Sequence, residues 1–304
     1  MEGTKNKLIS SKTEIILYQF FILPLNPLNG TFAIYNRCRC WLFKPLQGFV
    51  RLSGRQGLKI NMLALIILML FPVLTAFAQK KDLAYYQCAF FESYRAGNMA
   101  PWPGLIAEME QVKTTDMEWQ TEMVKAMYGL VGYQIGAKQK DLAKGYITKA
   151  DIYLERLLNA HPNSARLHSL SGAIYGYKIA LAFYKAPFLG PKSMYHIEKA
   201  IELDPAEPMG YIEKGNSLMY RPAAFGGDKM EGLSFYRKAL KLMDSRNTLK
   251  CDWQKMLLRA FILKGLYETN QNAEAKAFLS EMKRDYGSMD WIQQFVGADY
   301  MDGK

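Results

Sequence analysis

"RPAAFGGDKMEGLSFYRKAL", residues 221–240, contains the signals that end one helix and start another. Pro222 has no backbone N–H to donate, so it ends the helix before it. Gly226 and Gly227 permit backbone angles that other residues avoid, and we expect a positive φ at Gly227. Asp228 can accept hydrogen bonds from the N–H groups that open a new helix. The stretch therefore predicts a tight turn followed by a capped helix.

The residues behind this turn have helical spacing. Glu231 stands three residues after Asp228, which is the spacing of a capping box. Apolar side chains then recur three or four residues apart, with Lys and Arg between them. They are Met230, Leu233, Tyr236, Ala239, Leu240 and Met243. Together the two halves of the stretch predict the turn and second helix of a helical hairpin.

Similar signals for the end of a helix recur along the chain. Three helix ends resemble one another: "RLLNAHP" (156–162), "KAIELDP" (199–205) and "KALKLMD" (238–244). Ten residues separate Pro162 from Gly172, and ten separate Pro205 from Gly215. We expect each of these glycines to let a neighbouring helix approach closely. An internal repeat of helix pairs follows from this register.

A second turn, "YKAPFLGPKS" (184–193), has the aromatic, basic, proline and glycine residues of 220–229. The three glycines of "MYGLVGYQIG", Gly129, Gly132 and Gly136, lie three or four residues apart and predict close packing on one helix face. No strand pattern is present. We expect helices over 82–97, 102–112, 116–137, 140–160, 164–185, 192–203, 207–220, 228–243, 250–269 and 272–286.

These units resemble tetratricopeptide (TPR) repeats over about residues 116–286. Tyr211 and Gly215 match the first helix of the family pattern, and Ala200 and Pro205 match the end of the second. Further matches are Gly232, Tyr236, Ala239, Ala150, Leu154, Pro162, Ala275 and Leu279, whereas Asp244 and Leu157 depart from the pattern. Corresponding helix ends lie 43 and 39 residues apart, against roughly 34 in the usual unit. The proline–aromatic–Gly-Gly-Asp turn is also similar to that of periplasmic TPR proteins, including the T components of TRAP transporters.

The resemblance implies an all-α fold, a right-handed superhelix of about five antiparallel helix pairs. Residues 116–304 would form the TPR-like repeat domain, and 79–115 a preceding helical pair. Each hairpin leaves an apolar face that only stacking can bury, and stacking creates a concave surface lined by the first helices. Such a surface is where this family binds its partners.

Charge is unevenly distributed. The chain of 304 residues carries a formal charge of +11, which could suggest a nucleic-acid partner. Nine of the 39 Lys and Arg, but two of the 28 Asp and Glu, lie in residues 1–78. The remainder therefore holds 30 basic and 26 acidic side chains, an ordinary balance for a soluble domain. This distribution argues against nucleic-acid binding.

The stretch from Met62 to Ala78 is 17 uncharged residues ending in Ala-Phe-Ala. A short apolar run before small residues is typical of a secretory signal peptide, so we predict residues 58–78 as the signal, with cleavage near Ala78. Residues 1–57 are then interpreted as a disordered or mis-annotated extension. The alternative is a genuine extension with an internal membrane anchor. Cleavage would place the protein in the periplasm or outside the cell.

The cysteines do not define a metal site. Cys38 and Cys40 have one residue between them and no matching second pair. Cys88 and Cys251 follow the predicted signal, and the sequence leaves open whether they pair or stay as buried thiols.

Candidate binding residues come from the expected first helices and from the rim of the turn. They are His168, Tyr175, Lys178, Tyr211, Lys214, Asn216 and Trp253, with Phe188, Tyr220, Arg221 and Phe225 on the rim. Pro222, Gly226, Gly227 and Asp228 are interpreted as structural turn residues. Aromatics at helical spacing also fit packing between repeats, and Asn216 would need hydrogen-bond partners if buried.

The sequence contains no catalytic signature. His161, His168 and His196 lack HExxH or another zinc spacing, and no G-x-S-x-G or papain-like cysteine context occurs. We therefore expect a non-enzymatic protein with no cofactor and no metal. Two functions fit: an adaptor or scaffold that binds a protein or peptide partner in the cell envelope, or a soluble accessory protein that binds a small hydrophobic ligand, as the transporter T components would imply.

Overall fold

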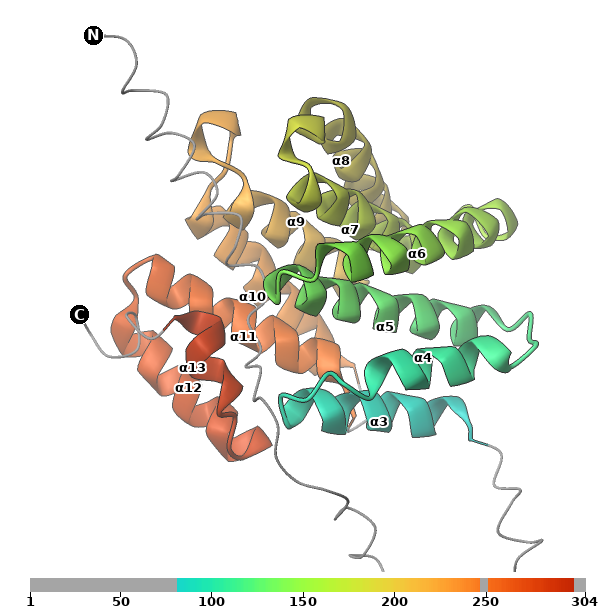
Figure 1. The fold of residues 1–304 in the computed structure, drawn as a ribbon. Coiled ribbons are helices and arrows are strands. Elements are labelled where there is room, and N and C mark those ends of the chain that lie inside the picture. Colours follow the sequence, from blue (N-terminus) through green and yellow to red (C-terminus); the bar gives the residue numbers. More distant parts are fainter. Residues whose placement is uncertain (1–80, 247–250, 298–304) are drawn as a thin grey trace, which may run out of the picture. The chain divides into compact units, whose positions relative to one another are not determined.

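A computed structural model describes residues 81–246 and 251–297 of the chain. This part is helical and contains no strand (Figure 1). Its elements are α3 (Leu83–Arg95), α4 (Trp102–Gln111), α5 (Met117–Gly136), α6 (Lys140–Ala160), α7 (Ala165–Leu181), η1 (Phe183–Lys185), α8 (Ala186–Leu203), α9 (Pro208–Tyr220), η2 (Ala223–Phe225), α10 (Lys229–Ser245), α11 (Trp253–Glu268), α12 (Asn272–Tyr286) and α13 (Trp291–Val296). The all-α prediction is confirmed. The predicted extension 1–57, the signal 58–78 and its cleavage near Ala78 lie outside the described residues.

All ten expected helices are present, and the sequence reasoning missed the short helix α13. It was also wrong about residues 186–191, which it placed in a turn. Helix α8 already begins at Ala186 and includes both Pro187 and Pro191. Pro187 lies in the first helical turn, where a backbone N–H has no partner within the helix, so its ring costs little. The turn that the sequence predicts at 184–193 is thus shorter and contains η1.

Consecutive helices pack as neighbours (Figure 1). The closest pairings are α7 with α8, α9 with α10, and α5 with α6, and α11 packs against both α10 and α12. Each pair meets the next where its second helix contacts the following first helix, as α6 does α7, α8 does α9 and α10 does α11, and α7 also contacts the first helices α5 and α9. Helix α11 also contacts α3 and α13, so the first and last described helices share its surface.

Two of the hairpin turns have the same backbone geometry. Lys138, between α5 and α6, has φ +61°, and Asn270, between α11 and α12, has φ +60°. In each turn the next residue donates its N–H to the carbonyl five residues before it, Gln139 to Gln134 and Gln271 to Leu266. This is the left-handed ending of a helix that reverses the chain.

One continuous cluster of buried apolar side chains joins the pairs. Its aromatic centre contains Trp102 of α4 and Trp253 of α11, whose ring centroids are 5.1 Å apart in an edge-to-face contact. Gly129 of α5 makes room for both rings, because a Cβ there would lie 2.7 Å from each. The close packing expected at Gly129 is confirmed. A side chain at this position would push α5 away from the core.

The repeated glycines have the expected role. A Cβ on Gly172 would lie 2.7 Å from Ile197 of α8, and one on Gly215 would lie 2.5 Å from the ring of Tyr236 of α10. Each glycine therefore lets the second helix of its own pair approach the first.

The turn at 221–228 confirms some of its expected features and corrects two. Gly226 has φ +84°, and the Asp228 carboxylate accepts from Glu231 N at 2.9 Å. Asp228 N, however, donates to Leu218 O, so the reciprocal half of the capping box is absent from this turn. The expected positive φ at Gly227 was wrong. Glycine is needed there because a Cβ would lie 1.8 Å from the carbonyl oxygen of Arg221.

Cys88 of α3 and Cys251, two residues before α11, form a disulfide across 163 residues of sequence. The question that the sequence left open is thereby answered. The bond ties the first described helix to the start of α11.

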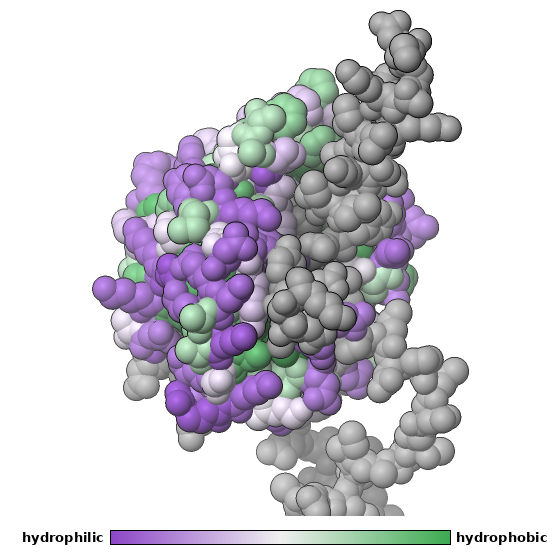
Figure 2. Space-filling model, turned by 90° about the vertical axis from the view of Figure 1, so that its left-hand side faces the viewer, coloured by the Kyte–Doolittle hydropathy of each residue, from purple (hydrophilic) through white to green (hydrophobic). Residues whose placement is uncertain are grey.

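The surface facing the viewer in Figure 2 is mainly hydrophilic, with hydrophobic residues gathered toward its upper edge. None of the helices in the described ranges is both long and apolar enough to cross a membrane.

Candidate binding pocket

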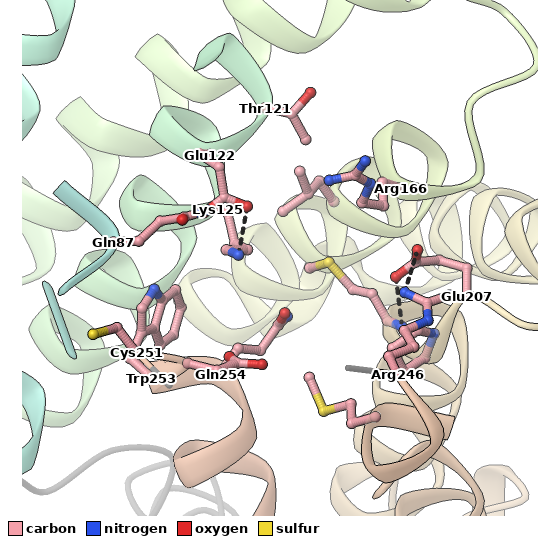
Figure 3. Close-up of a pocket in the computed structure, with 15 residues that line it drawn as sticks. Gln87, Thr121, Glu122, Lys125, Arg166, Glu207, Arg246, Cys251, Trp253 and Gln254 are labelled. Carbon is pink, nitrogen blue, oxygen red and sulfur yellow. Dashed lines mark hydrogen bonds and ion pairs between the residues drawn. The ribbon is translucent and has the colours of Figure 1, made fainter. Parts of the chain in front are cut away.

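A cavity of about 360 Å³ lies where the starts of α5, α7, α9 and α11 come together (Figure 3). Thr121, Glu122 and Lys125 come from α5, and Arg166 and Leu170 from α7. The other lining residues are Gln87, Glu207, Pro208, Met209, Met243, Arg246, Cys251, Asp252, Trp253 and Gln254. Its size is within the range of small-ligand sites, ~300–1,000 Å³.

Three cations line the cavity, and each is held by an acidic partner. Lys125 Nζ donates to Glu122 Oε1 at 2.6 Å. Both terminal nitrogens of Arg166 donate to the carboxylate of Glu118, at 2.6 and 2.7 Å. These contacts fix the cationic groups at the wall before any ligand arrives, which lowers the ordering cost of binding.

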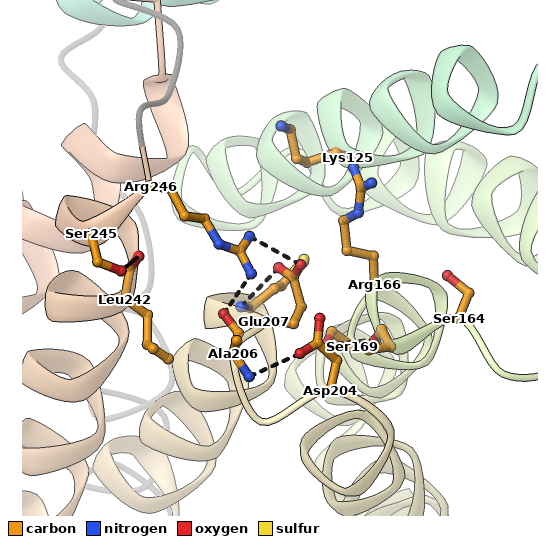
Figure 4. Close-up of polar contacts among 12 residues, drawn as sticks. Lys125, Ser164, Arg166, Ser169, Asp204, Ala206, Glu207, Leu242, Ser245 and Arg246 are labelled. Carbon is orange, nitrogen blue, oxygen red and sulfur yellow. Dashed lines mark hydrogen bonds and ion pairs between the residues drawn. The ribbon is translucent and has the colours of Figure 1, made fainter.

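The third cation, Arg246, lies in the opposite wall of the cavity. Arg246 Nη1 donates to Glu207 Oε2 at 3.2 Å, and Nη2 donates to the carbonyl oxygen of Ala206 (Figure 4). The end of α10 is thereby joined to the start of α9. The pKa of Arg166 is raised, first by its hydrogen bonds to Glu118 and further by the charges of Glu207 and Glu122. The ionic groups of both walls therefore act on one another.

The helix starts themselves are already occupied. Asp116 caps α5, Ser164 caps α7, Glu207 caps α9 and Asp252 caps α11, each by accepting from a backbone N–H of the first turn. A ligand would therefore meet the side chains of the wall and not open helix ends.

Two buried polar side chains in the wall lack a hydrogen-bond partner among the described residues. They are the hydroxyl of Thr121, whose residue is 1% exposed, and the amide nitrogen of Gln254, whose residue is 6% exposed. An unsatisfied buried polar atom costs free energy, ~1–3 kcal/mol, unless water or a ligand completes it. The Gln254 amide is a donor, so its missing partner is an acceptor atom.

A buried polar cluster adjoins the cavity through Trp253, whose ring lies 6.5 Å from that of Tyr128. Tyr128 stacks on Tyr177 of α7 at 5.3 Å. Glu213 of α9 is fully enclosed, and burial raises its pKa to about 7, against an opposing hydrogen bond from Asn216. Burial and the Glu213 carboxylate also raise the pKa of the Tyr128 hydroxyl. The buried carboxyl group therefore keeps its proton to a higher pH than an exposed glutamate does.

Of the binding residues predicted from sequence, Trp253 alone lines this cavity. Tyr211 is buried, stacks on Phe235 of α10 and donates its hydroxyl proton to Pro205 O. Lys214 pairs with Glu198 of α8. We expected these two side chains to line the concave surface of the stack. This was wrong, because both contact second helices.

The predicted residues of α7 also face a second helix. His168 Nδ1 lies 2.9 Å from His196 Nδ1 of α8, and Tyr175 stacks on the His196 ring. Lys178 pairs with Asp151 of α6. His168 and Tyr175 thus contact the second helix of their own pair, Lys178 contacts that of the preceding pair, and none of the three lines the cavity.

The rim residues have a mixed outcome. Phe188 and Phe225 are exposed, while Tyr220 and Arg221 are partly buried. Arg221, the residue after α9, donates to the Ser217 hydroxyl of that helix. Asn216 has the partners that a buried amide needs, because it donates to Glu213 and accepts from the Tyr236 hydroxyl at 2.7 Å.

Sequence reasoning missed the ionic wall because it chose the wrong helix face. Arg166 and His168 are two residues apart on α7, which turns the side chain through about 200°. The available signal was a basic residue in the first half of a mostly buried first helix, as at Lys125 and Arg166.

Within residues 81–246 and 251–297, no group of three or more His, Cys, Asp or Glu side chains is placed to hold a metal ion. No protein-family model matches the chain, and no curated protein matches it. Among solved structures, the HusA haemophore from Porphyromonas gingivalis is similar in fold, with a TM-score of 0.52 and 18% sequence identity. The match covers 64% of this chain and 97% of that one. The described part is thus an all-α protein with the helical fold of that neighbour.

Proposed function

We propose that this protein is a non-enzymatic, exported binding protein whose helix pairs form a TPR-like superhelix around a small-ligand pocket. The ligand class is an organic molecule with an apolar body and one or more acceptor-rich groups such as carboxylates. The observation that carries the proposal is the cavity, in which three fixed cations and the unsatisfied Gln254 amide face an apolar wall.

The chemistry of the wall selects this class. Gln254 lacks an acceptor, and the bond from Lys125 to Glu122 takes one of the three protons that an ammonium can donate. The acids Glu122 and Glu207 are already engaged as acceptors by Lys125 and Arg246. Met209, Met243 and Trp253 supply an apolar surface for the body of the ligand. A carboxylate against Arg or Lys gains a charge-assisted hydrogen bond.

Haem belongs to this ligand class, since it is a large apolar ring with two carboxylates. The structural neighbour is named a haemophore, and haem is therefore the first candidate ligand. An adaptor for an extended peptide receives less support, because Tyr211, Lys214 and their neighbours on the expected concave face pack against second helices.

Binding assays on the full chain test the proposal. We would titrate haem, following its absorbance, and a panel of long-chain fatty acids and aromatic carboxylates, following the melting temperature. Arg246→Gln and Gln254→Leu should weaken binding of the active compound at least about tenfold, the free energy of roughly one charge-assisted hydrogen bond.

Lys144→Gln is the matched control, because Lys144 forms an exposed ion pair with Asp141 on α6, away from the cavity. It should bind like the unmodified protein. Equal affinity in all three variants, or no stabilisation by any compound, would contradict the pocket as the binding site.

A further inference from the structure

Two chain reversals lie at the end of the helices opposite the cavity. Helices α7 and α9 both start at the cavity, so the turns that follow them, around η1 and η2, lie at the far end (Figure 1). The helices beside these turns are in contact, because the Ser217 hydroxyl of α9 donates to the Met194 sulfur of α8 at 3.3 Å.

These turns concentrate exposed aromatic side chains. Tyr184 and Phe188 are each 77% exposed, and Phe225 is 69% exposed. Phe183, Tyr195 and Met230 are exposed on the same two segments. Six of the ten large apolar side chains that are exposed in the described part therefore lie between residues 183 and 230. The hydrophobic residues at the upper edge of Figure 2 are at the height of these turns in Figure 1.

Basic residues accompany the aromatics in the first turn. Lys185 and Lys192 are exposed, and residues 182–197 contain no acidic side chain. In the second turn Asp228 caps its own helix, and Lys229 pairs with Glu268, so its charges are satisfied internally. The combined patch carries a net positive charge at its aromatic end.

We propose that this patch is a docking surface for an anionic phospholipid membrane. It comprises Phe183, Tyr184, Lys185, Phe188, Lys192 and Phe225, and we call it the tip surface. Aromatic rings favour the interface between lipid headgroups and water, and lysines are attracted to anionic headgroups. The rings lie outside the core and the lysines are exposed, with Lys185 Nζ 5.9 Å from the centroid of the Tyr184 ring. The membrane contact leaves the cavity at the opposite end open to solvent.

Sedimentation with lipid vesicles tests this surface. The full chain also contains the apolar stretch 62–78, so the comparison is between variants that share it. Phe188→Ser/Phe225→Ser should lower partitioning onto phosphatidylglycerol vesicles at least about tenfold. The matched control is Leu142→Ser/Ile152→Ser, which removes two exposed apolar side chains from α6 and should bind as the unmodified protein does.

A variant without the two lysines separates electrostatic attraction to anionic lipid from non-specific hydrophobic binding. Lys185→Gln/Lys192→Gln should weaken binding to phosphatidylglycerol vesicles and leave binding to phosphatidylcholine vesicles unchanged. Circular-dichroism melting would confirm that every variant is folded. Equal vesicle binding by the tip and control variants would overturn the proposal. It would equally be overturned if the tip variant only abolished self-association or capture of a protein partner, with vesicle binding intact.

Discussion

Asn216 donates its side-chain amide to Glu213 at 3.2 Å, one helical turn away on α9, and holds that carboxyl group inside the core. The same Asn216 accepts from the Tyr236 hydroxyl of α10 at 2.7 Å. One amide therefore links an enclosed acid to the second helix of its pair. A second carboxyl oxygen of Glu213 has no hydrogen-bond partner in the described part of the chain.

Replacing Glu213 with Gln should change how stability depends on pH. Burial raises the pKa of Glu213 from 4.5 to about 7, so the folded state holds the proton more tightly than the unfolded chain. The contribution of Glu213 to the free energy of unfolding is fully present below pH 4.5 and is lost as pH rises through 7. The loss amounts to about 3 kcal/mol. We would measure the free energy of unfolding by denaturant between pH 4.5 and 8. As pH rises, Glu213→Gln should become more stable relative to the unmodified protein. If the two proteins show the same dependence on pH, Glu213 does not have the raised pKa.

His196 should make the protein less stable as pH falls, whereas Glu213 makes it less stable as pH rises. His168 Nε2 lies 2.9 Å from Pro162 O, which can only accept, so His168 Nδ1 accepts from His196 Nδ1–H. Burial and the neighbouring His168 lower the pKa of His196 from 6.5 to about 4. The folded state therefore disfavours protonation, and stability present above pH 6.5 is lost as pH falls toward 4.

His196→Phe keeps a ring against Tyr175 and removes the titrating group. Its melting temperature should change less between pH 6.5 and 4 than that of the unmodified protein. Since His196 is only partly buried, the effect should be modest. The same acid dependence in the Phe variant would argue that another group controls it.

Removal of the disulfide should lower stability without changing the fold. The Cys88–Cys251 bond closes a separation of 163 residues, and such a constraint limits the unfolded chain. Cys88→Ala/Cys251→Ala should cost about 2–5 kcal/mol in unfolding free energy, with unchanged helical circular dichroism. A reducing agent should destabilise the unmodified protein to the level of the variant and leave the variant unaffected.

The two adjacent glycines of the α9–α10 turn should respond differently to substitution. Gly226 has a positive φ, and no heavy atom lies within 4 Å of the position that a Cβ would occupy, so Gly226→Asn should cost less than about 1 kcal/mol. Gly227→Val would place its Cβ 1.8 Å from Arg221 O and should cost about 2 kcal/mol or more. Thermal melts of both variants check this order; equal costs would refute the steric role of Gly227.

Thr121→Val should raise the stability of the free protein and lower its affinity for a ligand. The Thr121 hydroxyl is buried without a partner among the described residues, so a methyl group of similar size removes an unsatisfied polar atom. We expect the free protein to gain up to about 1 kcal/mol in stability. Affinity for any ligand that completes the hydroxyl should fall in the same variant. A large loss of stability would show that the hydroxyl is already satisfied.

Local features were predictable because the residues that encode them are close in sequence. Ten helices follow from apolar spacing, and the capped start of α10 follows from Asp228. The close packing at Gly172 and Gly215 follows from their fixed distance to a turn proline. The start of α8 was missed because Pro187 and Pro191 also fit a turn, and only packing of α8 against α7 decides between the two.

Which face of each first helix points inward was not predictable in this way. Both faces of α7 carry polar and aromatic residues, so periodicity alone leaves its rotation undetermined. Contact with α5 and α9 on one side and α8 on the other turns Arg166 toward the cavity and His168 toward His196.

The sequence by itself determined that the described part of this protein is built from paired helices, because turn chemistry and helical periodicity act over a few residues. The tertiary structure decided the cavity, the ionic walls and the pairing of Cys88 with Cys251. Those features join residues far apart in the chain, and their geometry depends on the rotation and spacing of helices that only the packed core fixes.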